Sequence, residues 1–206
     1  KGKSASRRIF FQYRKPAPPV PVKSFGIDWI QTYPEGDLVL MPDDKINFKV
    51  KAYPGMKMFT GNTALFELPV TETNGMPGIY QGTYEVQKTD SFQQQKFRVT
   101  LTDSSEKQIT IETGNHFSVL HENPVAITRG RLAHLEYGLG DDRLGGAKVG
   151  YIDSLIPLII TGKVGSHYRV KLAQHRTAYI PDEHVNLLPK GSFTPSSLTE
   201  RMEVFG

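Results

Sequence analysis

The chain has 206 residues, with 25 lysines and arginines against 21 aspartates and glutamates, a formal charge of +4 and no cysteine. The absence of cysteine excludes disulfide bonds, a thiolate zinc site and a cysteine nucleophile. No stretch approaches the roughly 18 apolar residues that a membrane-spanning helix needs, so no membrane span is expected.

Residues 1–24 are predicted to be a basic, proline-rich arm. Residues 1–15 hold six basic residues and no acidic one, which leaves 19 basic against 21 acidic residues in the remainder, a net charge of −2. A nucleic-acid-binding domain would normally carry its positive patch on the fold, so we expect no nucleic-acid partner. The segment KPAPPVPV (15–22) is typical of an extended linker, although proline-rich segments also bind aromatic grooves.

Residues 25–122 are predicted to form a β-sandwich. Five segments alternate apolar or aromatic residues with polar ones at period two, which is the pattern of half-buried strands. These segments are IDWIQTY (27–33), DKINFKVKAY (44–53), GIYQGTYEV (78–86), KFRVTLT (96–102) and KQITIET (107–113). Turn sequences such as PEGD (34–37) and TNGMPG (73–78) separate them. Short strands at this spacing favour two packed sheets, and no segment in this range predicts a helix.

Two of these segments, GIYQGTYEV and KFRVTLT, carry a family resemblance. They resemble the late strands of immunoglobulin-like domains in bacterial surface and cell-wall proteins. The cysteine pair of those domains is missing, and Trp29 lies earlier than their usual core tryptophan. The resemblance implies an immunoglobulin-like sandwich and says little about activity.

Residues 123–190 are predicted to form a second, smaller β-unit. HENPVAITRG (121–130) is expected to be a hinge, because it contains a proline and ends in glycine. The strands expected after it are RLAHLEY (131–137), VGYI (149–152), LIPLIITGKV (155–164), HYRVKLAQ (167–174) and TAYIP (177–181), with DEHVNLL (182–188) as a closing turn or strand. Five short strands are enough for a small barrel. Residues 191–206 are expected to be a tail that leads into a further domain.

The segment GSHYRVKLAQHRTAYIPDEHVNLL (165–188) resembles a bacterial SH3-like (SH3b) domain. The segment LEYGLGDDRLGGAKVGYI (135–152), together with MPDDKINFKVKAYPGMKMFTGN (41–62) and GIYQGTYEV, is similar to the non-catalytic N-terminal region of certain bacterial N-acetylmuramoyl-L-alanine amidases, over about residues 25–190. The resemblance implies that the partners are peptidoglycan or muropeptide and the protein's own catalytic domain. It also implies export to the periplasm or cell envelope, with zinc in the absent catalytic domain and no cofactor in this chain.

The polar segment GLGDDRLGG (138–146) departs from the SH3-like pattern and has two interpretations. It lacks the Lys-Ser/Thr pair of a phosphate loop, and its aspartates are adjacent instead of spaced as in a calcium loop. In the first interpretation it is a structural loop, with glycines at the tight turns. In the second it recognises a ligand through charged groups and neighbouring aromatic rings. The residues predicted to bind are Tyr137, Asp141, Asp142, Arg143, Tyr151, Tyr168 and Tyr179.

No catalytic or metal site is predicted in this chain. An amidase zinc site needs two histidines and a carboxylate, and the six histidines form no HExxH-type pair. No G-x-S-x-G motif is present, and the adjacent carboxylates lie in turn-like contexts. Three functions stay open: a targeting and spacing region of a cell-wall amidase, a module whose barrel binds a proline-rich or regulatory peptide, and an enzyme.

Overall fold

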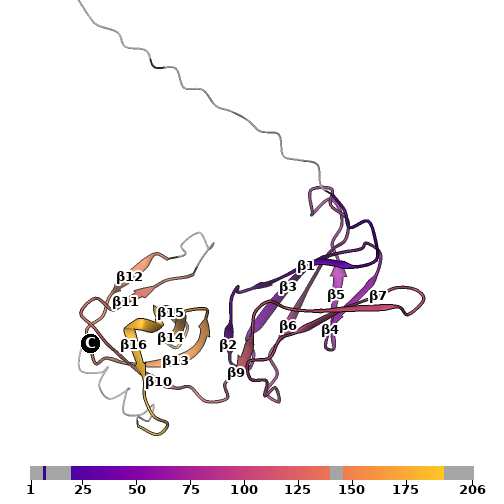
Figure 1. Cartoon of the computed structure of the whole chain (residues 1–206). Coiled ribbons are helices and arrows are strands. Elements are labelled where there is room, and N and C mark those ends of the chain that lie inside the picture. Colours follow the sequence, from indigo (N-terminus) through magenta and orange to yellow (C-terminus); the bar gives the residue numbers. More distant parts are fainter. Residues whose placement is uncertain (1–6, 8–19, 140–145, 193–206) are drawn as a thin grey trace, which may run out of the picture.

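The computed structural model describes residues 7, 20–139 and 146–192 of the chain. In these ranges the chain forms 16 strands and one 3-10 turn, with no α-helix, so the predicted all-β class is confirmed. The strands build two bodies, a sandwich and a nearly closed barrel, each around its own hydrophobic core (Figure 1). Over the described residues, no helix has the length and hydropathy needed to cross a membrane.

The first body is a sandwich with an immunoglobulin-like strand order. Its strands are β1 (Ile27–Tyr33), β2 (Leu38–Leu40), β3 (Lys45–Ala52), β4 (Lys57–Thr60), β5 (Thr63–Glu67), β6 (Ile79–Glu85), β7 (Arg98–Thr102), β8 (Gln108–Glu112) and β9 (Phe117–Val119). One side has the order β1-β3-β6-β5 and the other β4-β7-β8, with a β4–β5 hairpin between them. This is the A-B-E-D and C-F-G order of immunoglobulin domains, and the short β2 adds to the fold by pairing in parallel with β9.

Alternation along the strands builds the sandwich core. Ile46, Phe48 and Val50 on β3 are fully buried, as the period-two pattern predicts. Phe97 lies at the centre of an aromatic cluster, and its ring meets those of Phe48 and Phe117 edge-on at centroid distances of 5.5 and 4.8 Å. Edge-on aromatic pairs add to the stabilisation from apolar burial, so large rings hold this core together without a disulfide.

Tyr80 on β6 is fully buried in this core, and its hydroxyl bonds to the backbone. The hydroxyl donates to the carbonyl oxygen of Tyr53 at 2.9 Å and accepts from the N–H of Met56 at 2.9 Å. We expect Tyr80→Phe to lower the free energy of unfolding at pH 7 by about 1–3 kcal/mol, because both backbone groups lose their partner. Urea unfolding of the two proteins measures the difference.

Tyr80→Phe should also reduce the amount of folding stability that the protein loses at alkaline pH. Burial raises the pKa of Tyr80 from 10.0 to about 12, so the folded state favours the protonated phenol. The contribution of the protonated phenol to folding stability is fully present below about pH 10 and is lost as the pH rises towards 12. Tyr84, whose pKa burial also raises to about 12, remains in both proteins. The variant should therefore lose less stability across this window than the wild type, and equal losses would contradict the assignment.

The second body is a small barrel. Its elements are β10 (Val125–Thr128), β11 (His134–Glu136), β12 (Lys148–Tyr151), β13 (Pro157–Val164), β14 (His167–Ala173), β15 (Arg176–Pro181), the 3-10 turn η1 (Asp182–His184) and β16 (Val185–Leu187). The order is β12-β11-β15-β14-β13-β10-β16. Buried residues of β10, β13, β14, β15 and β16 form its core. The β11–β12 hairpin follows β10, and the 3-10 turn precedes β16, which completes a small, nearly closed barrel.

The predicted hinge is wrong at residues 125–128, because these residues form the first barrel strand. β10 pairs with β13 on one side and with β16 on the other. Its Ala126 is fully buried beside Ile160, Val170 and Ile180 in the barrel core. A proline before the strand and a glycine after it mark its two ends, so the turn signals delimit an element that the sequence analysis took for a linker.

The two bodies are joined by a continuous β-ladder. β2 of the sandwich pairs antiparallel with β13 of the barrel, with Val39 opposite Lys163 and Leu38 opposite Val164. Figure 1 shows β2 and β9 on the side of the sandwich that faces the barrel. Val164 also packs against the sandwich core. Because a ladder fixes the direction and register of both strands, it gives the two bodies one relative orientation.

An ion pair and a glycine complete this joint. Arg169 Nη2 lies 2.6 Å from Asp44 Oδ2, and the two side chains are only 22% and 20% exposed. The same carboxylate oxygen accepts the N–H of Met41 at 2.8 Å. A Cβ at Gly162 would lie 2.7 Å from the carbonyl oxygen of Val39. Glycine at this position therefore allows β2 to approach β13.

Candidate functional site

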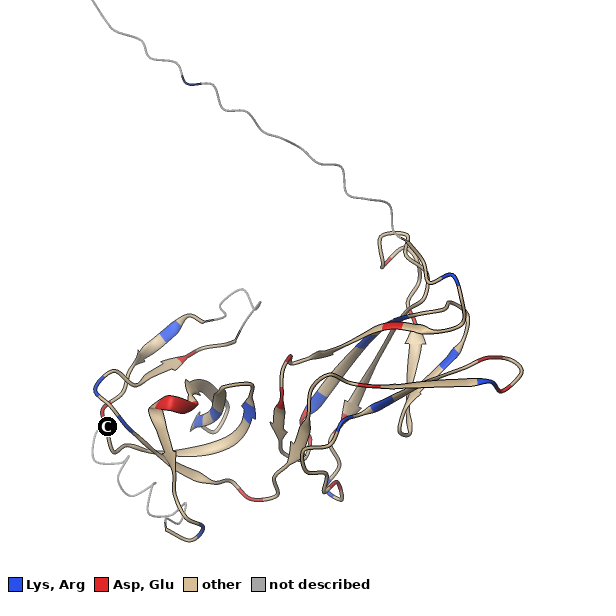
Figure 2. Cartoon of the chain, in the orientation of Figure 1, with Lys and Arg blue, Asp and Glu red and all other residues tan. Residues whose placement is uncertain are grey.

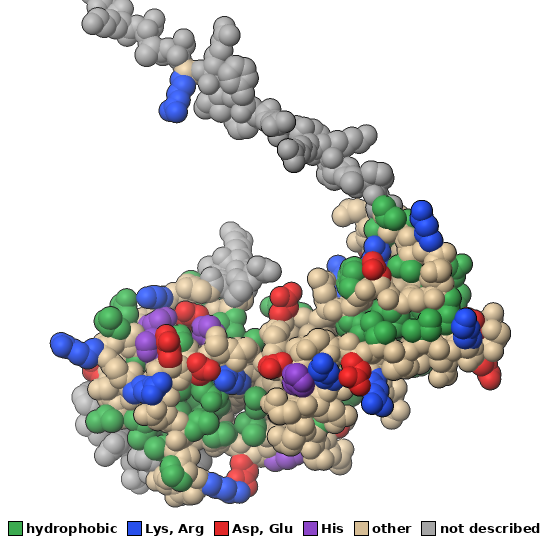
Figure 3. All heavy atoms as spheres, in the orientation of Figure 1, with side chains coloured by type: hydrophobic (Ala, Val, Ile, Leu, Met, Phe, Trp, Pro, Cys, Tyr) green, Lys and Arg blue, Asp and Glu red, His purple; other side chains and the backbone are tan. Residues whose placement is uncertain are grey.

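A cleft of about 820 Å³ lies between the sandwich and the barrel. Its volume falls within the range of small-molecule binding sites. The space-filling view shows the notch where the two bodies meet (Figure 3). Basic and acidic residues are interspersed along the ribbons of both bodies (Figure 2). Because both bodies line the cleft, it is the place where side chains from the sandwich and from the barrel can contact one ligand.

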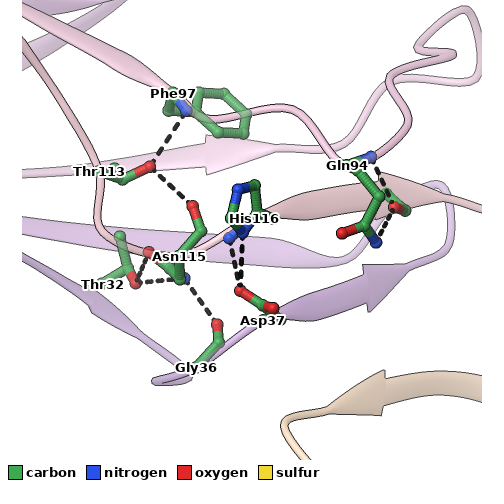
Figure 4. A network of polar contacts seen from close by, with 9 residues as sticks. Thr32, Gly36, Asp37, Gln94, Phe97, Thr113, Asn115 and His116 are labelled. Carbon is green, nitrogen blue, oxygen red and sulfur yellow. Dashed lines mark hydrogen bonds and ion pairs between the residues drawn. The ribbon is translucent and has the colours of Figure 1, made fainter.

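The sandwich supplies Tyr33 to the cleft from the end of β1, and Pro34 and Glu35 from the turn that follows it. This turn is held by Asn115, whose Nδ2 donates to the carbonyl oxygen of Gly36 at 2.7 Å and to Thr32 Oγ1 at 3.0 Å (Figure 4). Asn115 lies between β8 and β9, at the other end of the sandwich sequence. The wall is therefore positioned by a long-range contact.

Asp37 anchors the end of the same turn. Its Oδ1 accepts the backbone N–H of His116 at 2.7 Å, and this hydrogen bond lowers the pKa of the carboxyl below 3.8 (Figure 4). The bond therefore adds stability that is fully present above about pH 4 and is lost as the pH falls through the folded-state pKa.

We expect Asp37→Asn to be less stable than the wild type at pH 7 and to show a shallower loss of stability on acidification. A neutral amide accepts the N–H of His116 more weakly and does not titrate. Urea midpoints measured from neutral to acidic pH test this expectation. Parallel pH profiles for the two proteins would show that Asp37 does not contribute to acid unfolding.

The barrel supplies the other wall through the outer face of β15. Ala178 and Ile180 on this strand point into the barrel core, so Thr177 and Tyr179 face outwards and line the cleft. Tyr137 follows β11 beside them, because Glu136 on β11 pairs with Tyr179. Other lining residues are Gly138, Leu139, Val149, Val164, Leu172, His175 and Arg176.

Of the residues predicted to bind, the structure brings Tyr137 and Tyr179 together in the cleft. Tyr151 and Tyr168 do not line it. Tyr168 packs against the barrel core with the ammonium of Lys163 5.0 Å from its ring centroid, and Tyr151 is 65% exposed on β12. Asp141, Asp142 and Arg143 lie outside the described residues.

Sequence reasoning missed the contribution of the sandwich to the cleft. Tyr33 is 59% exposed at the end of β1, next to Pro34 and Glu35. The sequence analysis assigned these residues to the end of a strand and the following turn. Alternation gave no signal that Tyr33 lies outside the core, because period two places it on the same side of β1 as Ile27 and Trp29.

Two histidines contact Glu136 on another part of the barrel, and a third packs against one of them. His134 Nε2 lies 3.2 Å from Glu136 Oε1, and His167 Nε2 lies 3.6 Å from Oε2. The ring of His184 is 5.2 Å from that of His134. Within residues 20–139 and 146–192, no group of three or more potential ligands is arranged to hold a metal ion. These contacts link β11 to β14 and to the 3-10 turn.

Among the described residues, the lining of the cleft combines three tyrosine rings with one carboxylate, one guanidinium and one imidazole. Such a lining suits an elongated ligand, because rings pack on its flat or apolar faces and the charged groups bind its polar ends. A comparison of the chain with protein-family models, with curated proteins and with solved structures found no match.

Proposed function

We propose that this chain is the non-catalytic binding and spacing region of an exported peptidoglycan amidase, and that it holds peptidoglycan or muropeptide in the cleft. The observation that carries the proposal is that Tyr33, Tyr137 and Tyr179, from both bodies, line one cleft of about 820 Å³. Tyrosine rings offer large, rigid faces for stacking and a hydroxyl for hydrogen bonding. The amidase kinship itself rests on the sequence resemblance of residues 41–62, 78–86 and 135–152.

The joint between the bodies supports the spacing role. The β2–β13 ladder and the Arg169–Asp44 pair hold the sandwich and the barrel in one orientation. A ligand that contacts both bodies then meets a preformed site, which reduces the entropy lost on binding. In the parent protein, the zinc-dependent domain would perform hydrolysis, and this region would bind the wall and dock on that domain in the periplasm or cell envelope.

Sedimentation with purified sacculi tests the proposal. The chain should appear in the pellet at low and at physiological salt, and soluble muropeptides added in excess should release it. Because exposed charge contacts weaken with salt and apolar stacking does not, binding through the tyrosines should persist at physiological salt. A chain that stays in the supernatant at both salt concentrations would overturn the wall-binding role.

A second candidate function is binding of a proline-rich peptide. The exposed rings of Tyr33 and Tyr137 beside Pro34 resemble the aromatic grooves that bind polyproline II segments. The chain itself has a proline-rich sequence at residues 15–22. Deleting residues 1–22 should then shift the NMR signals of Tyr33 and Tyr137, and unchanged signals would exclude the intramolecular version.

A further inference from the structure

We propose that the cleft binds the peptide part of its ligand in one direction, with Glu35 receiving an ammonium group and Arg176, beside His175, receiving a carboxylate. This inference rests on the proposed function and narrows the ligand from peptidoglycan in general to its stem peptide. It adds specificity at both ends of the cleft and assigns one of them to the sandwich.

Glu35 lies at the joint end of the cleft. The carbonyl oxygen of Asp37 accepts the N–H of Gly165 at 2.8 Å, and a Cβ on Gly36 would lie 3.6 Å from the Cα of Gly165. The turn that carries Glu35 is therefore in contact with the hairpin between β13 and β14. Glu35 itself is exposed and lines the cleft from this end.

Arg176 is the first residue of β15 and pairs with the end of β14 that is farthest from the joint. The β14–β15 register pairs His167 with Pro181 at the joint end and Ala173 with Arg176 at the far hairpin. β14 has seven residues, and a strand rises about 3.3 Å per residue, so its ends are roughly 20 Å apart. The carboxylate and the guanidinium therefore mark the two ends of the cleft.

The tyrosines lie between these charged ends. Tyr179 on β15 is opposite Arg169, two positions from the joint end of β14, and Tyr137 lies alongside β15. Thr177 comes next towards Arg176 on the same outer face. A span of roughly 20 Å accommodates about six residues of an extended peptide, whose backbone could bond to the tyrosine and threonine hydroxyls.

Both charges are open to a ligand. Glu35 and Arg176 are exposed, and among the described residues neither forms an ion pair. Apart from the tyrosines, His175 is the other ionisable residue in the described lining. A guanidinium binds a carboxylate through two parallel hydrogen bonds, whereas a neutral glycan offers no charge to either end. Charge complementarity thus favours a peptide with both an ammonium group and a carboxylate.

Calorimetric titration of the whole chain tests the inference with four probes. The probes are a synthetic stem pentapeptide with a free amino terminus and a free terminal carboxylate, the same peptide acetylated on that amine, the same peptide amidated at that carboxylate, and chitotetraose as a glycan without peptide. The proteins are the wild type, Glu35→Gln and Arg176→Gln, with Glu72→Gln and Lys88→Gln as exposed controls outside the cleft. Thermal unfolding verifies that every variant folds.

We expect each cleft variant to weaken binding of the unmodified peptide roughly 10-fold and the two controls to leave it unchanged. Glu35→Gln should not weaken binding of the acetylated peptide any further, and Arg176→Gln should not weaken binding of the amidated peptide any further. Equal affinity for all three peptides, or preference for chitotetraose, would overturn the inference while sacculus binding leaves the proposed function in place. A chain that binds neither sacculi nor any probe would overturn both.

Discussion

Gly162→Ala is expected to uncouple the barrel from the sandwich. A Cβ at this position would lie 2.7 Å from the carbonyl oxygen of Val39 and 3.0 Å from Arg169 Nη2. The carbonyl belongs to the β2 backbone and cannot turn away as a side chain can. We expect the β2–β13 pairing to open and the free energy of unfolding to fall by about 1–3 kcal/mol, as for other substitutions that overpack an interior.

Small-angle scattering and urea unfolding measure the two effects. Loss of the ladder should increase the radius of gyration of the chain, because the bodies would then move about their connection. Gly114→Ala is the matched control, since nothing lies within 4 Å of a Cβ at Gly114. A Gly162→Ala protein with wild-type scattering and stability would show that the joint does not depend on close approach at this residue.

The double substitution of Tyr33 and Tyr137 by alanine is expected to abolish most binding to sacculi. The two rings are 59% and 62% exposed, so their removal should cost little folding stability. They come from opposite walls of the cleft. Aromatic residues at the centre of a binding site contribute on the order of 2 kcal/mol each, which predicts a loss of affinity of roughly 1,000-fold for the pair.

Tyr151→Ala provides the control for exposed tyrosine. Tyr151 has a similar exposure of 65% but lies on β12 outside the cleft lining. Quantitative sedimentation with sacculi compares the double variant, the control and the wild type. An equal loss in the control would indicate nonspecific binding by tyrosine, and full binding by the double variant would remove the cleft from the function.

The expected effects of Gly162→Ala and of the double tyrosine substitution are linked, because the joint between the two bodies also holds the cleft together. The ladder that Gly162 permits also holds the turn with Tyr33 and Glu35 opposite β15. If the bodies separate, the cleft loses one wall while each core stays intact. Gly162→Ala should therefore bind sacculi about as weakly as the double tyrosine variant, although it keeps every lining side chain.

The sequence by itself determined the all-β class and the inward faces of the long strands. Alternation at period two is a local property, and it placed Ile46, Phe48 and Val50 in the sandwich core correctly. It also located β13, β14 and β15 to within a few residues. These strands carry enough residues for a pattern to be recognised without knowledge of their partners.

Only the tertiary structure determined where the short strands form. β2 and β9 have three residues each, too few to show a period, and they exist because each pairs with the other and β2 also pairs with β13. The segment around Val125 shows the same effect, since turn signals on both sides concealed a strand that is held by two neighbours. Strand formation in such segments depends more on hydrogen-bonded pairing with neighbouring strands than on the local sequence pattern.

The cleft likewise depends on contacts between distant parts of the chain. Thr32 and Asn115, which position the sandwich wall, are 83 residues apart, and Asp44 and Arg169, which pair across the joint, are 125 residues apart. The sequence analysis selected Tyr137 and Tyr179, together with Tyr151 and Tyr168, as rings near a polar loop, but the sequence carried no information about what lies opposite them. The partners of these rings follow from the packing of two bodies, and packing is a property of the folded chain as a whole.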